Sequence, residues 1–372
     1  MNKTNPKGPR YTDLVASLSD EAPFVDPETQ ERDQGHLFAA RLGANENVFG
    51  PSPKAVSAMQ AADGDTWMYG TANSYELRNA LAAFHQIGTD NIVVGEGIDG
   101  LLGYLVRLLI GPGDKVVTSH GAYPTFNYHV AGYGGDIVTV PFNGNYEDPV
   151  ALVAKAAEVD AKLIYLANPD NPMGTIHDAG AIQAAIEAVP DGAVLILDEA
   201  YVEFAPKGVA IPFDTSDPRV IRMRTFSKAY GLAGVRVGYA IGHCGLIKSF
   251  DKIRNHFGLS RSGQIGALAA FQDQEYLAQT VASVATARER IAKIAIANGL
   301  QPIQSATNFV TIDCGRDADF AKAVVDDLAD RGIFIRRPFV APYTRCIRVS
   351  AGRAQDLDLF EAALPQALKA CG

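Results

Sequence analysis

Hydrophobic and polar positions alternate in blocks through the middle of the chain, and this pattern predicts a mostly parallel sheet covered by helices. Five short apolar segments are typical of strands, several of them buried on both faces. These predicted strands are 115–119, 136–140, 161–167, 193–201 and 220–226. The segments 151–159 and 179–189 between them predict helices, so the fold class is α/β. Because ligands bind at the carboxyl ends of parallel strands, we expect the polar residues that follow these strands to lie close together.

The pattern changes from about Leu259 onward and predicts a second, smaller α+β domain. A long helical stretch around 272–298 is followed by a strand-like segment, a helix with Phe320, Val324 and Leu328 on one face, and further short strands. At 372 residues, the chain is longer than a single core usually supports. We therefore expect an N-terminal arm with part of the small domain, a large cofactor-binding domain and a C-terminal small domain. Their predicted limits are 1–60, 61–257 and 258–372.

Composition and charge narrow the classes of function. A formal net charge of -9 argues against nucleic-acid or anionic-membrane partners, so any anion site must be built locally. The longest apolar run, 101–110, is too short to cross a bilayer, and the first fifteen residues contain no apolar signal core. The four cysteines show no metal-ligand spacing, which predicts no metal and fits the reducing cytoplasm.

The segment from Thr225 to Gly238 carries the clearest candidate chemistry. Lys228 and Arg236 are the only cations between Arg224 and Lys248, and they stand among glycines and apolar residues. Burial favours the neutral amine of a lysine, which an aldehyde cofactor requires. An arginine near two small hydroxyls, those of Thr225 and Ser227, suits a phosphate. Together they indicate pyridoxal phosphate (PLP), although a snorkelling lysine and a structural arginine are the alternative.

Polar residues follow two of the predicted strands where the sheet should bind its ligand. Asn168 and Asn171 come after one strand, and Asp198 ends the next, with Tyr201 three positions on. A buried aspartate needs a cation, which a protonated pyridine nitrogen supplies, or else it is a structural acid. Glu199 beside it is interpreted as structural. The chain has no G-x-x-x-x-G-K-[ST] loop, which argues against an ATPase.

A glycine-rich segment, GEGIDG at 95–100, lies between a predicted strand and helix. It matches the dinucleotide fingerprint, but the strand that follows does not end in an acidic residue. Backbone N–H groups of Gly97, Ile98 and Asp99 at a helix start could instead hold one phosphate. A single-phosphate site, a tight turn and an NAD site are the three readings, and the first is preferred.

Three further side chains have either a binding role or a purely structural one. Phe126 is the preferred aromatic cover for a cofactor ring, with Tyr123 second and core packing as the alternative for both. Arg348, on a strand with apolar neighbours, is a candidate clamp for a carboxylate or phosphate, or else an exposed edge residue. The histidines, His129 among them, show no ligand spacing and are taken as satisfied or surface residues.

The assembled motifs resemble the fold-type I PLP enzymes, and most of all the histidinol-phosphate aminotransferase group of class I/II aminotransferases. SKAYGLAGVRVG is similar to the family's lysine segment, NPDNPMGT to its NPxNPTG loop and LDEAY to its aspartate strand. The resemblance runs from about Pro23 to Gly352. It implies an aspartate-aminotransferase-like fold, whose large domain has a mostly parallel seven-stranded sheet and whose smaller domain is α+β.

The resemblance also implies a role for each matching residue. Lys228 would be the Schiff-base lysine and proton carrier, Asp198 would hold the pyridine nitrogen, and Asn171 and Tyr201 would bind the phenolic oxygen. The implied phosphate ligands are Ser227, Arg236 and the turn at Gly97, Ile98 and Asp99, with Thr225 a weaker candidate. Tyr69 would reach the cofactor of the second subunit of a homodimer. The implied substrate-binding residues are Arg348, Asn47 and Phe24.

Departures from the family pattern bear on the substrate. The family often has NENPYG where this chain has NENVFG, and Phe24 occupies the place of a tyrosine that approaches the substrate phosphate. Met173 replaces the usual threonine. The predicted function is amino transfer between an amino acid, histidinol phosphate or an aromatic amino acid included, and a 2-oxo acid. Three alternative functions are a PLP decarboxylase of the threonine-phosphate type, an NAD oxidoreductase and a PLP-sensing regulator. A regulator would need a basic DNA-binding module before the PLP domain, and the N-terminal arm is too short and not basic enough for one.

Overall fold

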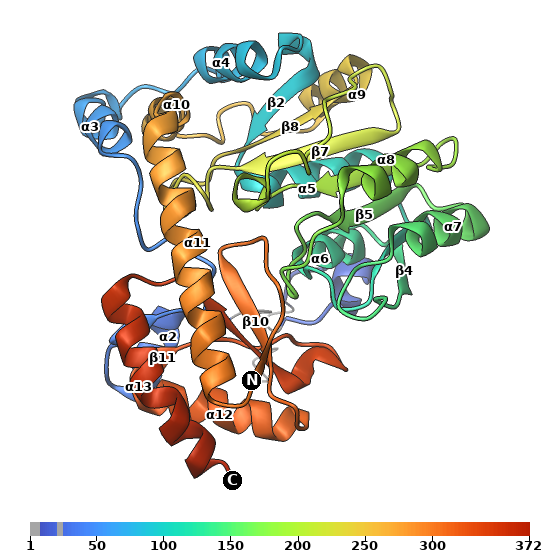
Figure 1. The fold of residues 1–372 in the computed structure, drawn as a ribbon. Helices are drawn as coiled ribbons and strands as arrows, with labels where there is room; N and C mark the ends of the chain where they lie inside the picture. The colour runs from blue at the N-terminus through green and yellow to red at the C-terminus, as the bar shows by residue number, and fades with distance from the viewer. Residues whose placement is uncertain (1–7, 21–24) are drawn as a thin grey trace, which may run out of the picture.

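The chain folds into two lobes, seen in a computed structural model that describes residues 8–20 and 25–372. Figure 1 shows the light-blue, green and yellow segments around the larger sheet, and the red and most of the orange segments, with the dark-blue helix α2, around the smaller one. The long helix α11 (Gln274–Ala297) runs from the large lobe along the small one. The two lobes meet where the green and yellow strands of the large sheet end.

The large sheet has seven strands in the order β2-β8-β7-β6-β5-β3-β4. Five neighbouring strands, from β4 to β7, run parallel, and β8 runs antiparallel to both β7 and β2. The predicted mostly parallel seven-stranded sheet is confirmed. Its strands are β2 (Ile92–Gly95), β3 (Lys115–Ser119), β4 (Asp136–Val140), β5 (Leu163–Ala167), β6 (Val194–Asp198), β7 (Val220–Thr225) and β8 (Gly238–Gly242).

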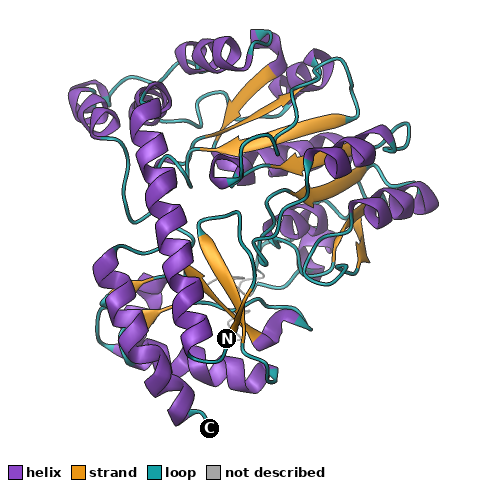
Figure 2. Cartoon of the chain, in the orientation of Figure 1, coloured by secondary structure: helices purple, strands orange, loops and turns teal. Residues whose placement is uncertain are grey.

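Helices cover both faces of this sheet, as the purple ribbons around the orange strands show in Figure 2. Tyr165 in β5 faces the side of α5, while its neighbours Ile164 and Leu166 pack in the cluster under α7 and α8, as the period of two requires. The apolar strands are thus buried on both faces. The covering helices are α3 (Pro53–Ala61), α4 (Tyr75–His85), α5 (Gly97–Leu109), α6 (Thr125–Gly132), α7 (Pro149–Val159), α8 (Ala179–Glu187), α9 (Cys244–Ser249) and α10 (Arg261–Gln272).

The small lobe is built on a short antiparallel sheet of order β12-β10-β9 and a parallel pair of β1 with β11. Its core joins residues far apart in sequence, such as Leu42, Phe309 and Phe360. The predicted small α+β unit is present. Its elements are β1 (Ala40–Arg41), β9 (Gln301–Pro302), β10 (Phe309–Asp313), α12 (Ala318–Asp330), β11 (Ile333–Phe334), β12 (Cys346–Ser350) and α13 (Ala354–Ala370).

Two details bear on the expected chain organisation. The N-terminal arm contains the helices α1 (Asp13–Ser17) and α2 (Pro27–Gln34), each with a side chain that caps its first turn. Helices α3 and α10 pack with β2 and β8 in one core cluster. The domain limits themselves stay a prediction. Within the described ranges, no helix is long and apolar enough to cross a membrane.

Candidate active site

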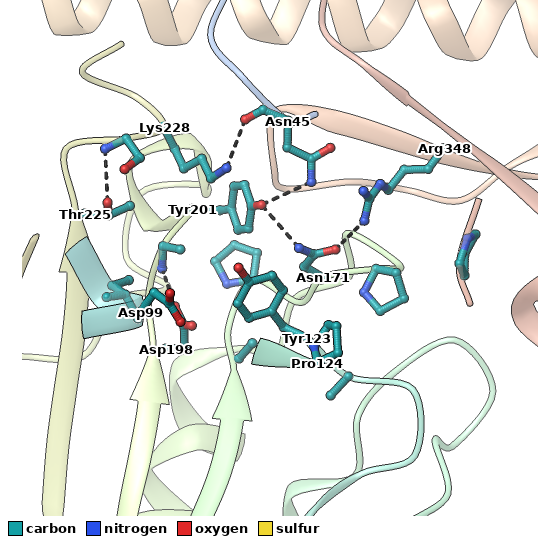
Figure 3. A pocket seen from close by; sticks show the side chains of 18 of the residues that line it. Asn45, Asp99, Tyr123, Pro124, Asn171, Asp198, Tyr201, Thr225, Lys228 and Arg348 are labelled. Carbon is teal, nitrogen blue, oxygen red and sulfur yellow. Dashed lines mark hydrogen bonds between the residues drawn. The ribbon is translucent and has the colours of Figure 1, made fainter. Parts of the chain in front are cut away.

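A cavity of about 290 Å³ lies where the carboxyl ends of β5, β6 and β7 face the small lobe. This is the edge at which the sequence predicts a ligand site. Figure 3 shows side chains from both lobes pointing into it. The lining residues singled out from the sequence are Ile98, Asp99, Tyr123, Asn171, Asp198, Tyr201, Thr225, Ser227, Lys228, Arg236 and Arg348.

Lys228 follows the end of β7 and points across the cavity. A turn fixes its backbone: the Ser227 N–H donates to the Thr225 hydroxyl at 3.0 Å. The Lys228 amine donates to the carbonyl oxygen of Asn45 at 3.1 Å, which orients the side chain (Figure 3). Burial, together with the positive charges of Arg348 and Arg236, lowers the pKa of Lys228 to about 8. At pH 7 about one tenth of the amine is therefore neutral, far more than for an ordinary lysine.

Asp198 ends β6 at the floor of the cavity. Its carboxylate accepts hydrogen bonds from the Tyr165 hydroxyl at 2.7 Å and from the Ala200 N–H at 2.9 Å. Burial raises the pKa of Asp198 to about 6, although these donors act in the opposite direction. Within the described chain, no cation forms an ion pair with this carboxylate. A buried acid of this kind suits a cationic ligand nitrogen.

Tyr201 stands at the centre of a hydrogen-bond chain that joins the two lobes. Its phenolic oxygen accepts from the Asn45 amide at 3.2 Å and from the Asn171 amide at 3.4 Å. The Asn171 carbonyl oxygen accepts from Arg348 at 2.6 Å, as the dashed lines in Figure 3 show. Burial raises the pKa of Tyr201, so the hydroxyl keeps its proton. Since its oxygen already accepts two amides, its O–H is left to donate to a ligand oxygen.

The opposite end of the cavity is suited to a phosphate. Arg236 donates to the Ser227 hydroxyl at 3.1 Å and lies against the start of α5, at Gly97. A Cβ at Gly97 would lie 2.5 Å from the Arg236 guanidinium, and Gly97 has a φ of +77°, so only glycine fits there. The first N–H groups of a helix have no partner within the helix and bind anions well. Gly97, Ile98 and Asp99 thus form this end with Ser227 and Arg236.

Some predicted site residues are elsewhere. Phe126 is fully buried and stacks on Tyr165, with ring centroids 5.0 Å apart, because it lies in the first turn of α6 and faces the sheet. Phe126 does not line the cavity, whereas Tyr123, ahead of the helix, does; which of the two covers a cofactor ring stays a prediction. The Asn47 amide donates to the Ala229 carbonyl and accepts from the Phe49 N–H, and its role toward a substrate also stays a prediction.

Two other predictions find no test in this structure. Phe24 lies outside the described residues. Tyr69 does not line the cavity of its own chain; its side chain is 78% exposed and contacts the ring of Phe257, with centroids 5.0 Å apart. The role of Tyr69 toward a second subunit stays a prediction.

Asn45 and Arg336 line the cavity although the sequence did not single them out. Asn45 orients both Lys228 and Tyr201, and the only local signal for it is the dense run of Asn and Gly in which it stands. Arg336 lies beside Arg348, and their backbones exchange N–H···O hydrogen bonds of 3.2 and 2.6 Å. The signal for Arg336 is an arginine directly after an apolar strand, but no pattern tells which strand lies next to it.

The cavity's side chains fit PLP on their own chemistry. A buried amine with a lowered pKa suits an aldehyde, an unpaired buried carboxylate suits a pyridinium, and a helix start with Arg236 suits a phosphate. The residues that would hold the cofactor are Lys228, Asp198, Tyr201, Asn171, Ser227, Arg236 and the start of α5. When bound, PLP supplies an electron sink that lets a bond at the substrate's amino-bearing carbon break.

This fold and this cavity define a PLP-dependent aminotransferase. The chain belongs to the family "Aminotransferase class I and II", whose sequence profile matches residues 40–364. A histidinol-phosphate aminotransferase from Sinorhizobium meliloti, solved with pyridoxal-5'-phosphate, is 50% identical and has a TM-score of 0.96, with 99% of this chain and 100% of that chain covered. The NAD oxidoreductase and decarboxylase readings are not favoured by these matches.

Further relatives agree on the class. A histidinol-phosphate aminotransferase from Jannaschia sp. is 35% identical over 87% of this chain and 89% of its own length. One from Anaeromyxobacter sp. is 33% identical over 96% of this chain and 98% of its own length. An aspartate aminotransferase from Thermus thermophilus is 19% identical with a TM-score of 0.81 and covers 97% of this chain and 100% of that chain, so it shares the fold.

Proposed function

We propose that this aminotransferase moves the amino group between histidinol phosphate and a 2-oxo acid. The observation that carries the proposal is the pair of arginines, Arg336 and Arg348, on the small-lobe side of the cavity. Several relatives carry the name of the same activity. Phe24, in place of the family's usual tyrosine, removes one hydroxyl from the expected phosphate contacts, so the two arginines take the larger share.

Two guanidinium groups provide more positive charge than a single carboxylate requires. Burial lowers the pKa of Arg348 to about 10, and the neighbouring charge of Arg336 acts in the same direction. Burial also lowers the pKa of Arg336. Such a site gains most from a dianionic ligand group, because a phosphate brings two charges and several acceptor oxygens. A substrate with a terminal phosphate fits these two side chains.

The chain's own residues account for the catalytic work. The Lys228 amine is held by the Asn45 carbonyl. At its Nζ it takes a proton from the substrate's amino-bearing carbon, and it returns that proton later in the same amino transfer. Asp198 keeps the nitrogen of the cofactor ring protonated through its negative charge. Tyr201 and Asn171 fix the ring oxygen, and the Arg348 contact keeps the Asn171 amide in one orientation. The small lobe thereby orients both the cofactor and the substrate.

We further propose that the enzyme acts as a homodimer in the cytoplasm. Tyr69 is 78% exposed and Phe257 53%, and their rings lie against each other; Trp67, two residues before Tyr69 in sequence, is 80% exposed. Exposed large aromatic residues are typical of interfaces. Four free cysteines agree with a reducing compartment. Sedimentation analysis at micromolar concentration tests the assembly, and a monomer that is fully active would contradict it.

A half-reaction experiment tests the substrate. The holoenzyme is mixed with histidinol phosphate, histidinol, phenylalanine or threonine phosphate, and the cofactor absorbance is followed. We expect histidinol phosphate to convert the cofactor at concentrations at least about tenfold lower than histidinol. R336Q should remove this difference, whereas R345Q, an arginine paired with Asp313 outside the cavity, should retain it. Equal response to histidinol, or carbon dioxide release from threonine phosphate, would refute the assignment.

A further inference from the structure

An acidic side chain lies at the end of the cavity that is suited to a phosphate, although a carboxylate and a phosphate carry charges of the same sign. Asp99 is in the first turn of α5 and lines the cavity with Ser227 and Arg236. Its backbone N–H is suited to a phosphate, and an acid in a first turn stabilises the helix. Its carboxylate, however, carries a charge of the same sign as a phosphate group and would repel one bound at this end.

His129, on the neighbouring helix α6, meets this carboxylate. The His129 Nε2 lies 3.0 Å from the Asp99 Oδ1, so the imidazole donates to the acid on the side of α6. Both side chains are partly buried, which limits screening of the pair by solvent. Among the described residues, His129 is the only hydrogen-bond partner of the Asp99 carboxylate.

Helix α5 has a slot that fits the His129 ring. Gly103 stands four residues after Asp99, on the same face of α5. A Cβ at Gly103 would lie 2.8 Å from Cε1 and 2.9 Å from Nδ1 of His129, closer than a side chain tolerates. The glycine therefore lets the imidazole lie flat on α5 and reach Asp99. The histidine, the glycine and the acid form one arrangement across the two helices.

We propose that His129 is a positioning residue for cofactor binding. It holds the Asp99 carboxylate toward α6 through this hydrogen bond, so that the start of α5 presents N–H groups rather than an acid to the phosphate. The proposal rests on PLP binding by this family and is independent of the substrate assigned above. The same pair also ties α6, which follows Tyr123, to the helix that receives the phosphate.

The test compares ligands with and without a phosphate. Full-length apoenzyme is titrated with PLP and with pyridoxal, and binding is followed by visible absorbance. We expect H129A to bind PLP about tenfold more weakly than the wild type, with pyridoxal binding changed less than about twofold. The double variant D99N/H129A should regain most of the PLP affinity, because the uncompensated charge is then gone. H36A, at an exposed histidine in the N-terminal arm, is the control and should match the wild type.

A purely structural role for His129 predicts a different result. H129A would then weaken PLP and pyridoxal alike, and D99N would bring no recovery; either outcome overturns the proposal. If H129A does not fold, H129Q and D99N/H129Q provide the same comparison, since glutamine fits the slot with less disturbance and carries no charge. Unchanged PLP affinity in a folded H129A or H129Q protein also overturns it. A failed reaction with histidinol phosphate leaves these titrations unaffected.

Discussion

Arg348 in β12 donates a hydrogen bond of 2.6 Å to the side-chain oxygen of Asn171, which lies in the loop after β5. The first residue belongs to the small lobe and the second to the large lobe, and Asn171 in turn donates to Tyr201. The arginine that we propose binds the substrate is therefore linked to the donors that we propose for the cofactor's ring oxygen. The position of the small lobe and the orientation of the Asn171 amide depend on one another.

Replacing Arg348 by lysine tests this link. Lysine keeps the charge but loses the forked donors, so Asn171 and the substrate anion cannot both be satisfied. We expect kcat/KM to fall by roughly 30- to 150-fold, the equivalent of about 2–3 kcal/mol for a hydrogen bond to a charged group. Steady-state kinetics measure the change, with R345K as the control. A loss below about threefold would show that the fork is dispensable.

The lowered pKa of Lys228 predicts how cofactor uptake depends on pH. The neutral amine is the reactive form, and the pKa is about 8 because of burial and the neighbouring Arg348 and Arg236 charges. Uptake of PLP by the apoenzyme should accelerate as the pH rises through about 8 and then level off. Stopped-flow absorbance follows it, and K228A should show no shift of the cofactor band at any pH. A midpoint near that of a free lysine would contradict the prediction.

The hydrogen bond from Tyr165 lowers the pKa of Asp198. Burial raises the pKa of Asp198 to about 6, and the hydrogen bond from Tyr165 holds it back from a higher value. Y165F removes that donor, so the carboxylate protonates at a higher pH and PLP binding should weaken at a higher pH than in the wild type. Affinity measured between pH 5 and 8 gives the two midpoints. In D198N this acidic weakening should vanish; if it persists there, another group is responsible.

Glu199 does not line the cavity, and we expect its replacement to lower the free energy of unfolding. Its buried carboxylate pairs with Arg222 at 2.5 Å and Arg224 at 2.9 Å. Removing one partner of a buried ion pair costs about 3–5 kcal/mol, so E199Q should unfold at markedly lower denaturant. E187Q, at an exposed helix position, is the control. A change in unfolding free energy below about 1 kcal/mol in E199Q would refute this reading.

The same pair gives stability a pH dependence. Burial acts to raise the pKa of Glu199, but Arg224 and Arg222 outweigh it and lower the pKa below its ordinary value of 4.5. The stabilisation is therefore complete above the pKa of the unfolded chain and is lost as the pH falls through the lower folded value. Unfolding free energies measured from pH 6 downward should fall more steeply in the wild type than in E199Q. Parallel curves would mean that Glu199 does not contribute.

The sequence alone predicted the mostly parallel sheet and the polar residues at the ends of its strands. Long apolar segments and their polar endings locate β3, β4 and β5 and place Asp198 and Asn171 at one edge, because strand burial and chain direction are local properties. It did not predict β8, a strand with two glycines and little alternation. The residue types around Lys228 and Arg236 indicated PLP but left a purely structural lysine and arginine as the alternative.

Only the tertiary structure decided which side chains meet across the lobes. Phe126 rather than Tyr123 faces the core because the helix starts at Thr125 and its phase is set by packing on Tyr165. Asn45 reaches Lys228, and Arg336 lies beside Arg348, through contacts between segments that are distant in sequence. Such contacts depend on how two lobes close around one cavity, and no periodicity within a single strand or helix records that.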